Sequence, residues 1–361
     1  MSAVDDLINA PQFSLGPEDR ERQLLPLLHD LVEWHRHRNS VYGDLIAAGG
    51  LPNPETAGVA ALPYLPVRAF KQLDLLSVDR SSVVKVLTSS GTTGQNVSRI
   101  YLDAENATRQ QIALSSVMTT VLGPDRLPML IVDTRGIIAS RSSFSARAAG
   151  VIGMMTFGRD HTWLLDDDMS LKLDVLEEFL AKYDGQRVLI FGFTFMVWQY
   201  LLQAIPPGKY DLSRATLIHS GGWKKLESIA VDGVAFKAEW ERRTSLTSSH
   251  NFYGMVEQIG SIFVEGEDGW LHCPNFADVV IRNPEDWSVA LPGEPGVIEV
   301  ISALPTSYPG HVLLTEDLGI AEPDPGPGGW RGTRFKVLGR LPKAELRGCS
   351  DTHSARMPVS A

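Results

Sequence analysis

The chain has 361 residues, and its 33 Lys and Arg against 43 Asp and Glu give a formal net charge of −10. With 43% hydrophobic and 21% charged residues, the composition is that of a globular chain and excludes a largely disordered protein. The acidic balance also argues against a protein that coats nucleic acid, because such binding depends on many Lys and Arg contacts to phosphates. The length suits two domains, or one large α/β domain with appendages.

Cysteine usage and the N-terminus indicate where the protein works. Cys273 and Cys349 cannot build a disulfide framework, and no Cys-x-x-Cys pair suggests a zinc or redox site. The N-terminus lacks the basic and apolar segments of a secretory signal, so we expect a cytoplasmic protein. Residues 188–205 are uncharged and approach the length of a membrane span, but Pro-Pro-Gly ends them at 206–208. We interpret this stretch as a buried strand, a turn and an apolar helix, and expect no membrane span.

The first 80 residues are expected to pack against a larger domain. Residues 17–38 open with Pro-Glu-Asp, which suits a helix N-terminus, and an apolar face then recurs at three- and four-residue spacing. That face is formed by Leu24, Leu28, Leu31, Val32 and His35. Prolines in 62–71 disfavour a regular helix, so this segment is predicted to be an extended arm.

Beyond residue 80 the pattern changes twice. Apolar runs at 83–87, 128–132, 188–191 and 215–219 alternate with helical patterns, one of them after Asp103, which favours a mainly parallel sheet wrapped by helices. After Gly260, short runs at 279–282, 296–301 and 311–314 lie between Pro/Gly turns and indicate a smaller β-rich subdomain. We therefore expect four segments: 1–80, 81–260, 261–338 and a short tail at 339–361.

The strongest local motif follows the expected buried strand at 83–87. It consists of Thr88, Ser89, Ser90, Gly91, Thr92, Thr93 and Gly94. Hydroxyls and glycines in such a loop let backbone N–H groups close around phosphate oxygens, while the hydroxyls donate further hydrogen bonds. The loop lacks the Gly-Lys-Ser/Thr ending of a Walker motif. The alternative is a flexible Ser/Gly linker.

The loop resembles the phosphate loop of adenylate-forming enzymes, and other segments follow in the order of that superfamily. The segment resembling the one against adenine is Ser220, Gly221, Gly222 and Trp223, while 251–257 resembles the aromatic-Gly-x-x-Glu motif and contains Tyr253, Gly254 and Glu257. The resemblance implies that Glu257 helps to hold Mg²⁺ and that Asp317, in a Thr-Glu-Asp segment, binds the ribose of ATP. It places Arg340 at the hinge before the C-terminal domain. For Glu257 and Asp317 the alternative is an ordinary surface acid.

Segments 62–71, 191–194, 219–224 and 343–350 are similar to acyl-protein synthetases of the LuxE type. This resemblance implies an α/β fold: an adenylate-forming N-terminal domain of parallel sheets wrapped by helices, a smaller β-rich subdomain and a truncated C-terminal domain. It also implies that the acyl group passes from AMP to Cys349 and then to a reductase partner. Arg340, Lys343 and Arg347 would favour the thiolate of Cys349. The alternative is a buried inert thiol, which we expect for Cys273.

The acyl pocket is predicted around Phe191, Phe193, Thr194 and Trp198, where aromatic residues favour an apolar or aromatic acid. His219 ends an expected strand and is a candidate to orient the substrate carboxylate; a structural histidine is the alternative. Trp223 and Tyr253 are candidates to stack on adenine, or they belong to the core.

Three functions remain open. The first is an AMP-forming acid–thiol ligase that uses ATP and Mg²⁺, acts on a carboxylic acid, and serves an acyl reductase or acyl-carrier protein. The second is a synthetase that passes the acyl-adenylate to an amine, CoA or a carrier-protein thiol. The third is a catalytically degenerate nucleotide-binding scaffold of a reductase complex, because the superfamily's C-terminal lysine has no identifiable counterpart here. The oligomeric state and the identity of the acid do not follow from the sequence.

Overall fold

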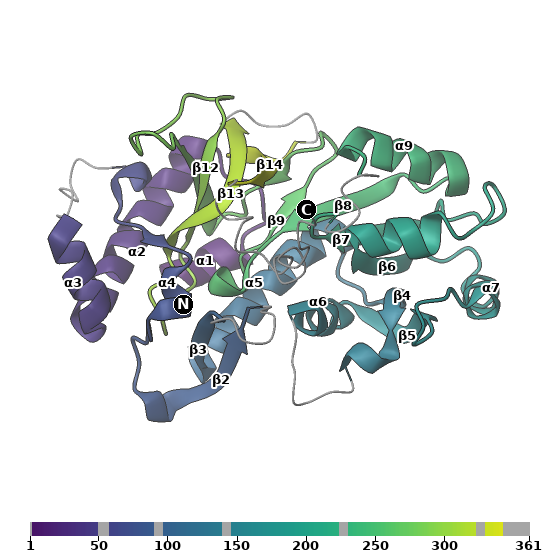
Figure 1. The fold of residues 1–361 in the computed structure, drawn as a ribbon, viewed down its shortest axis with the longest axis horizontal. Helices are drawn as coiled ribbons and strands as arrows, with labels where there is room; N and C mark the ends of the chain where they lie inside the picture. Colours follow the sequence, from purple (N-terminus) through teal and green to yellow (C-terminus); the bar gives the residue numbers. More distant parts are fainter. Residues whose placement is uncertain are drawn as a thin grey trace, which may run out of the picture. The chain divides into compact units, whose positions relative to one another are not determined.

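The computed structural model describes residues 2–49, 58–89, 97–138, 146–223, 230–322 and 329–341 (Figure 1). They belong to two compact units, and each unit is discontinuous in sequence. Unit 1 comprises Met1–Leu114, Met255–Ser261 and His272–Ala361; unit 2 comprises Ser115–Gly254 and Ile262–Leu271. The division into four consecutive segments expected from the sequence stays a prediction.

Unit 2 is built on a parallel sheet with strand order β5-β4-β6-β7-β8, to which β9 adds antiparallel. The strands are β4 (Leu127–Thr134), β5 (Gly158–Leu165), β6 (Val188–Phe193), β7 (Ala215–Ser220), β8 (Ser248–Tyr253) and β9 (Phe263–Glu265). Its helices are α6 (Ala146–Met155), α7 (Leu173–Lys182), α8 (Thr194–Met196) with a π-helical turn at Val197–Leu202, and α9 (Gly233–Thr244); α5 (Ala104–Leu122) crosses the unit boundary. The predicted α/β class is confirmed.

The central strands of unit 2 are the ones that the apolar runs predict. All but the last residue of both β4 and β6 are buried, as expected for strands covered on both faces of a parallel sheet. The uncharged stretch 188–205 divides into β6, α8 and the π-helical turn, which confirms the interpretation as a strand followed by a helix. Within the described part of the chain, no helix combines the length and the hydropathy needed to cross a membrane.

Unit 1 contains an antiparallel sheet in the order β11-β12-β13-β14, with β1 parallel to β13. These strands are β1 (Leu65–Pro66), β11 (Ala277–Arg282), β12 (Gly296–Ser302), β13 (Val312–Glu322) and β14 (Arg334–Arg340); β10 (Leu271–His272) lies where the sequence passes between the units. The three apolar runs after Gly260 therefore form strands as predicted. The helices are α1 (Ala3–Asn9), α2 (Pro17–Arg38), α3 (Ser40–Gly49) and α4 (Ala69–Gln72).

The expected packing face of α2 is confirmed, since Leu24, Leu28, Leu31, Val32 and His35 are all buried. The extended arm holds as far as Pro66, which lies in β1. Beyond that proline the chain turns into α4, so the prediction of an extended segment to residue 71 is wrong at its end. No further proline interrupts the backbone hydrogen bonds there.

The segment at 83–87 forms a strand as predicted, but the prediction that this strand is buried is wrong. This segment forms β2 (Val83–Thr88), which pairs antiparallel with β3 (Arg99–Asp103) in a two-stranded sheet outside the parallel one. Val84 is 64% exposed. A run of β-branched residues predicts a strand but does not indicate which sheet the strand joins. Here the strand belongs to a solvent-facing ribbon of two strands.

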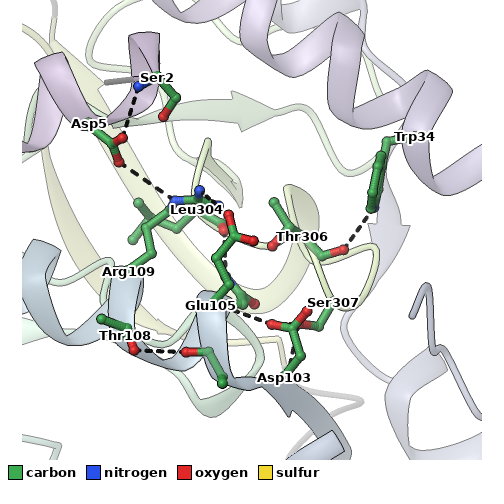
Figure 2. Close-up of polar contacts among 12 residues, drawn as sticks. Ser2, Asp5, Trp34, Asp103, Glu105, Thr108, Arg109, Leu304, Thr306 and Ser307 are labelled. Carbon is green, nitrogen blue, oxygen red and sulfur yellow. Dashed lines mark hydrogen bonds and ion pairs between the residues drawn. The ribbon is translucent and has the colours of Figure 1, made fainter. Parts of the chain in front are cut away.

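Polar contacts tie the elements of unit 1 together (Figure 2). The Ser307 hydroxyl donates to Asp103 Oδ1 at 3.0 Å, and Asn106 Nδ2 donates to the Leu304 carbonyl at 2.7 Å. Trp34 on α2 donates its indole N–H to the Thr306 carbonyl at 2.9 Å. The loop that precedes β13 is thus anchored to both α2 and the start of α5.

Two histidines are buried together in unit 1: His35, on the inner face of α2, and His311. His35 contacts Ser77 Oγ through Nδ1 at 2.7 Å and the Pro305 carbonyl through Nε2 at 3.1 Å. Its ring stacks on His311 with centroids 5.0 Å apart. Burial lowers the pKa of His35 from 6.5 to about 3 and lowers the pKa of His311 well below 6.5. Both side chains are therefore neutral in the folded protein at pH 7.

We expect the free energy of unfolding to fall as the pH drops from 7 to 5, because the unfolded chain then binds protons that folded His35 does not. For a pKa shifted from 6.5 to about 3, this single group accounts for about 2 kcal/mol of lost stability at pH 5. Urea unfolding of wild type and His35→Gln at both pH values measures the difference. His37→Gln is the control, because its side chain is 68% exposed. An equal pH effect in wild type and His35→Gln would contradict the assignment.

Candidate active site

Glu257 lies in unit 1 on a short 3₁₀ turn, Val256–Gln258, and is buried. The turn is anchored by the neighbouring Gln258, whose Nε2 donates to the Val300 carbonyl at 3.1 Å and to the Gly310 carbonyl at 2.9 Å. Burial raises the pKa of Glu257, against the lowering influence of Ser98 and Lys71. A buried carboxyl that is costly to ionise favours a cation beside it.

Asp317 lies on β13 opposite Arg340 of β14. Arg340 Nε approaches Asp317 Oδ1 at 3.4 Å, and the Asp317 backbone N–H donates to Thr315 Oγ1 at 3.1 Å. The Thr315 hydroxyl in turn donates to the Ile298 carbonyl at 2.7 Å, which fixes the strand to β12. The structure therefore brings together two residues that the resemblance assigned to separate motifs.

Glu316, the neighbour of Asp317 on β13, forms ion pairs with two arginines. Its carboxylate pairs with Arg68 at 2.9 Å and with Arg340 at 3.7 Å. Arg68 lies in the segment predicted to be an extended arm, and no role was predicted for it. Its partner Glu316 is 248 residues further along the chain, and sequence spacing carries no signal of such a contact. Glu316 thus pairs with two guanidinium groups, and one of them, that of Arg340, also approaches Asp317.

The base of the hydroxyl-rich loop is also in unit 1. Thr88 ends β2 opposite Arg99 of β3, and Ser98 donates its backbone N–H to Ser89 Oγ at 3.0 Å. Arg99 itself pairs with Asp74 at 3.4 Å. Five residues of the predicted phosphate loop lie outside the described residues: Ser90, Gly91, Thr92, Thr93 and Gly94. Cys349 also lies outside them. Their roles stay predictions.

In unit 2, His219 lies at the carboxyl end of the parallel sheet, in register with Gly192 of β6 and Asn251 of β8. Its Nδ1 is 2.9 Å from Thr194 Oγ1, and its ring packs against Phe236 of α9 at 4.6 Å between centroids. Burial is the largest cause that lowers the pKa of His219 to about 3, with a smaller contribution from Lys237. The imidazole is therefore neutral, and it sits where parallel sheets carry their ligands.

Phe236, which contacts this histidine, belongs to an aromatic cluster. Trp198 lies 5.4 Å from Trp223 and 5.5 Å from Phe236, centroid to centroid. Phe236 was not among the predicted residues, although the pair Phe236 and Trp240 has the i, i+4 spacing of a buried helical face. Phe191 and Phe193 instead contact each other edge to face at 6.2 Å, and Phe191 is almost fully buried. Their assignment to the acyl pocket stays a prediction.

The segment expected against adenine adopts a conformation that requires glycine. Gly221 has φ +82°, and a Cβ placed there would lie 3.4 Å from Phe193 Cδ1. Ser220 ends β7, Gly222 is exposed and Trp223 is half-buried. Tyr253 ends β8 with its ring 6.2 Å from that of Phe263, and Gly254 is exposed. Stacking on adenine remains a prediction for both aromatic rings.

Cys273 is fully buried in unit 1. Desolvation raises the pKa of its thiol well above 9.0, with a further raising influence from Asp278. This supports the expectation of an inert thiol.

The family model for acyl-protein synthetases, LuxE, matches residues 1–357. The chain belongs to this family. A curated relative, the long-chain-fatty-acid–luciferin-component ligase of Aliivibrio fischeri, is 24% identical over 97% of this chain and 93% of its own. Among solved structures, an open conformation of 2-hydroxyisobutyryl-CoA ligase in complex with 2-HIB-AMP and CoA matches with a TM-score of 0.66. It is 14% identical and the match covers 91% of this chain and 76% of the ligase. The same ligase in the thioesterification state also gives a TM-score of 0.66, at 14% identity, with 91% and 69% covered.

These likenesses confirm the family and the adenylate-forming fold that the sequence motifs indicated. Among the described residues, no group of three or more His, Cys, Asp and Glu is arranged to hold a metal ion. A single buried carboxylate such as Glu257 still fits Mg²⁺, because this ion is commonly held by one or two carboxylates together with substrate phosphates and water. The donor chemistry of this acyl-protein synthetase is therefore compatible with a magnesium–nucleotide complex.

Proposed function

We propose that this acyl-protein synthetase activates a carboxylic acid with ATP to acyl-AMP and pyrophosphate, and then transfers the acyl group to a thiol. The observation that carries the proposal is the family match over residues 1–357. The buried Glu257 and the Asp317–Arg340 pair support it, because both lie in the motifs that resemble the nucleotide-binding segments.

In the first step a substrate carboxylate oxygen bonds to the α-phosphorus of ATP, and the bond to pyrophosphate breaks. Two anions must meet, so the reaction depends on positive charge and hydrogen-bond donors placed before the chemistry begins. Mg²⁺, when bound, supplies charge neutralisation at the phosphates. Glu257 would hold that ion, Asp317 would accept hydrogen bonds from the ribose hydroxyls, and Arg340 would keep the Asp317 side chain oriented.

In the second step a thiolate attacks the acyl carbonyl carbon, the C–O bond to AMP breaks, and AMP leaves. We assign the thiolate to Cys349, since the other cysteine, Cys273, is buried with a raised pKa. The thiol gives up its proton before attack, which its basic neighbours in sequence, Lys343 and Arg347, favour. An acyl reductase or a carrier protein would then take the acyl group.

The curated relative's name indicates a long-chain fatty acid as the substrate class, and the aromatic cluster at Trp198, Trp223 and Phe236 provides apolar surface for one. Release of the acyl group to CoA or an amine is the second candidate, favoured by the fold shared with a CoA ligase.

Exchange of labelled pyrophosphate into ATP, measured with a panel of fatty and aromatic acids, tests the activation step. We expect exchange that depends on both Mg²⁺ and the acid, and that is strongest for long-chain fatty acids. An absence of exchange with every acid would contradict the proposed function and favour a nucleotide-binding scaffold.

A further inference from the structure

Thr194 and His219 form a buried pair that links the start of α8 to the end of β7. Thr194 is 7% exposed and His219 is 4% exposed. Thr194 Oγ1 and His219 Nδ1 are 2.9 Å apart. A neutral imidazole carries its single proton on one of the two nitrogens, so this contact decides what the other nitrogen can do.

The surroundings of Thr194 favour one direction of the hydrogen bond. Among the described residues, His219 Nδ1 is the one hydrogen-bond partner of the Thr194 hydroxyl. A threonine inside a helix often donates to the carbonyl four residues earlier, but Thr194 is the first residue of α8 and strand β6 precedes it. A buried hydroxyl without an acceptor is costly, which favours donation from the hydroxyl to Nδ1.

The second nitrogen of the ring is left with an open hydrogen-bonding position. His219 Nε2 is buried, and no atom of the described residues pairs with it. The neighbouring Asn251, in register on β8, likewise has a buried Oδ1 with no partner in the described ranges. Leaving such buried groups unpaired is costly, which points to a ligand or ordered water at this end of the sheet.

We propose that Thr194 is a positioning residue: its hydroxyl donates to His219 Nδ1 and keeps the imidazole proton on Nε2, from which His219 donates to the carboxylate of the acid substrate. This assignment rests on the proposed acid activation. A neutral donor suits the task, because it orients the carboxylate without neutralising the oxygen that must attack phosphorus. An unprotonated Nε2 would instead turn its lone pair towards the anion.

Charged groups near the pair fit this assignment. Burial is the main cause of the lowered pKa of His219, and Lys237 of α9 adds to it. The Lys237 ammonium group is held by Glu265 at 2.9 Å. Glu265 also accepts the Asn251 backbone N–H at 3.0 Å. The positive charge of Lys237 discourages a second positive charge on the His219 ring, so His219 stays neutral while it donates.

The first test reads the tautomer directly and requires no activity. Long-range ¹H–¹⁵N correlation spectra of histidine-labelled wild type, assigned with His219→Gln, should show a neutral ring protonated on Nε2 at pH 7. In Thr194→Val, which removes the hydroxyl at nearly constant volume, we expect a mixture of tautomers, and Thr194→Ser should restore the wild-type pattern. Thr216→Val is the matched control, because Thr216 is a buried threonine on β7 that contacts Ser248.

The second test measures pyrophosphate exchange in the same variants. Thr194→Val should raise the KM for the acid about ten-fold, the loss of one hydrogen bond to a charged group, with the KM for ATP unchanged. Thr194→Ser should stay near wild type. An Nδ1–H tautomer in the wild type, or a Thr194→Val enzyme with wild-type tautomer and acid KM, would overturn the proposal. A wild type that shows the Nε2–H tautomer but no exchange would instead refute the acid activation on which the assignment rests, and with it the role of Thr194 in that reaction.

Discussion

Cys349→Ser is expected to form acyl-AMP at the wild-type rate yet to retain no acyl group on the protein. In the proposed mechanism, adenylation depends on Glu257 and Asp317 and needs no thiol, whereas the transfer step needs a nucleophile that ionises near neutral pH. A serine hydroxyl offers almost no anion there without an activating base. Incubation with radioactive acid, ATP and Mg²⁺, followed by denaturation and scintillation counting, measures the bound label, and sensitivity to hydroxylamine identifies a thioester.

Cys273→Ser is the matched control for this experiment. Its thiol is buried and has a raised pKa, so the variant should keep both adenylation and the covalent label. A labelled Cys349→Ser protein would show that another residue accepts the acyl group. A wild type that releases all acyl groups to CoA would replace self-acylation by the second candidate function.

Glu257→Gln and Asp317→Asn are each expected to lower the rate of pyrophosphate exchange at least ten-fold, which corresponds to about 1.4 kcal/mol or more of transition-state stabilisation. Both changes keep the side-chain volume and remove the charge. Loss of a carboxylate that holds Mg²⁺ should also raise the magnesium concentration needed for half-maximal exchange in Glu257→Gln. Asp317→Asn should mainly raise the KM for ATP, since its assigned contact is with the ribose.

Glu322→Gln provides the control on the same strand as Asp317, because Glu322 pairs with Arg334 at 2.8 Å and has no assigned role. Thermal unfolding of each variant separates loss of function from loss of fold. If Glu257→Gln and Asp317→Asn exchange at the wild-type rate with unchanged magnesium and ATP dependence, the two residues do not bind the nucleotide.

The strands and helices with uniform apolar patterns were predictable from the sequence. β4, β6 and β7 are buried runs of aliphatic residues, and the buried face of α2 follows its spacing. β5 and β8 were not predicted, because their sequences contain residues such as Arg159 and Asp160 in β5 and Ser248 and His250 in β8. β5 lies at the sheet edge, where polar residues are tolerated. β8 carries polar residues of the candidate site.

In the candidate site, too, some features were predictable from the sequence and others were not. Glu257, Asp317 and His219 were predicted because short motifs mark them in the sequence. The side-chain contacts around these residues were not predicted, because they join residues far apart in the chain. Arg68 meets Glu316, and Thr194 meets His219, only through the pairing of strands and the placement of helices. Burial has the same origin, and it sets the pKa directions of Glu257 and His219.

A single-turnover experiment with enzyme in excess over a long-chain fatty acid tests whether the protein activates the acid with ATP and then carries the acyl group on Cys349. Nucleotides are separated by chromatography, and the intact protein is weighed by mass spectrometry. We expect one AMP and one pyrophosphate for each acid consumed, together with one protein-bound acyl group that maps to the peptide containing Cys349. Formation of ADP and phosphate, or AMP formation with no acyl group on the protein, would contradict this expectation.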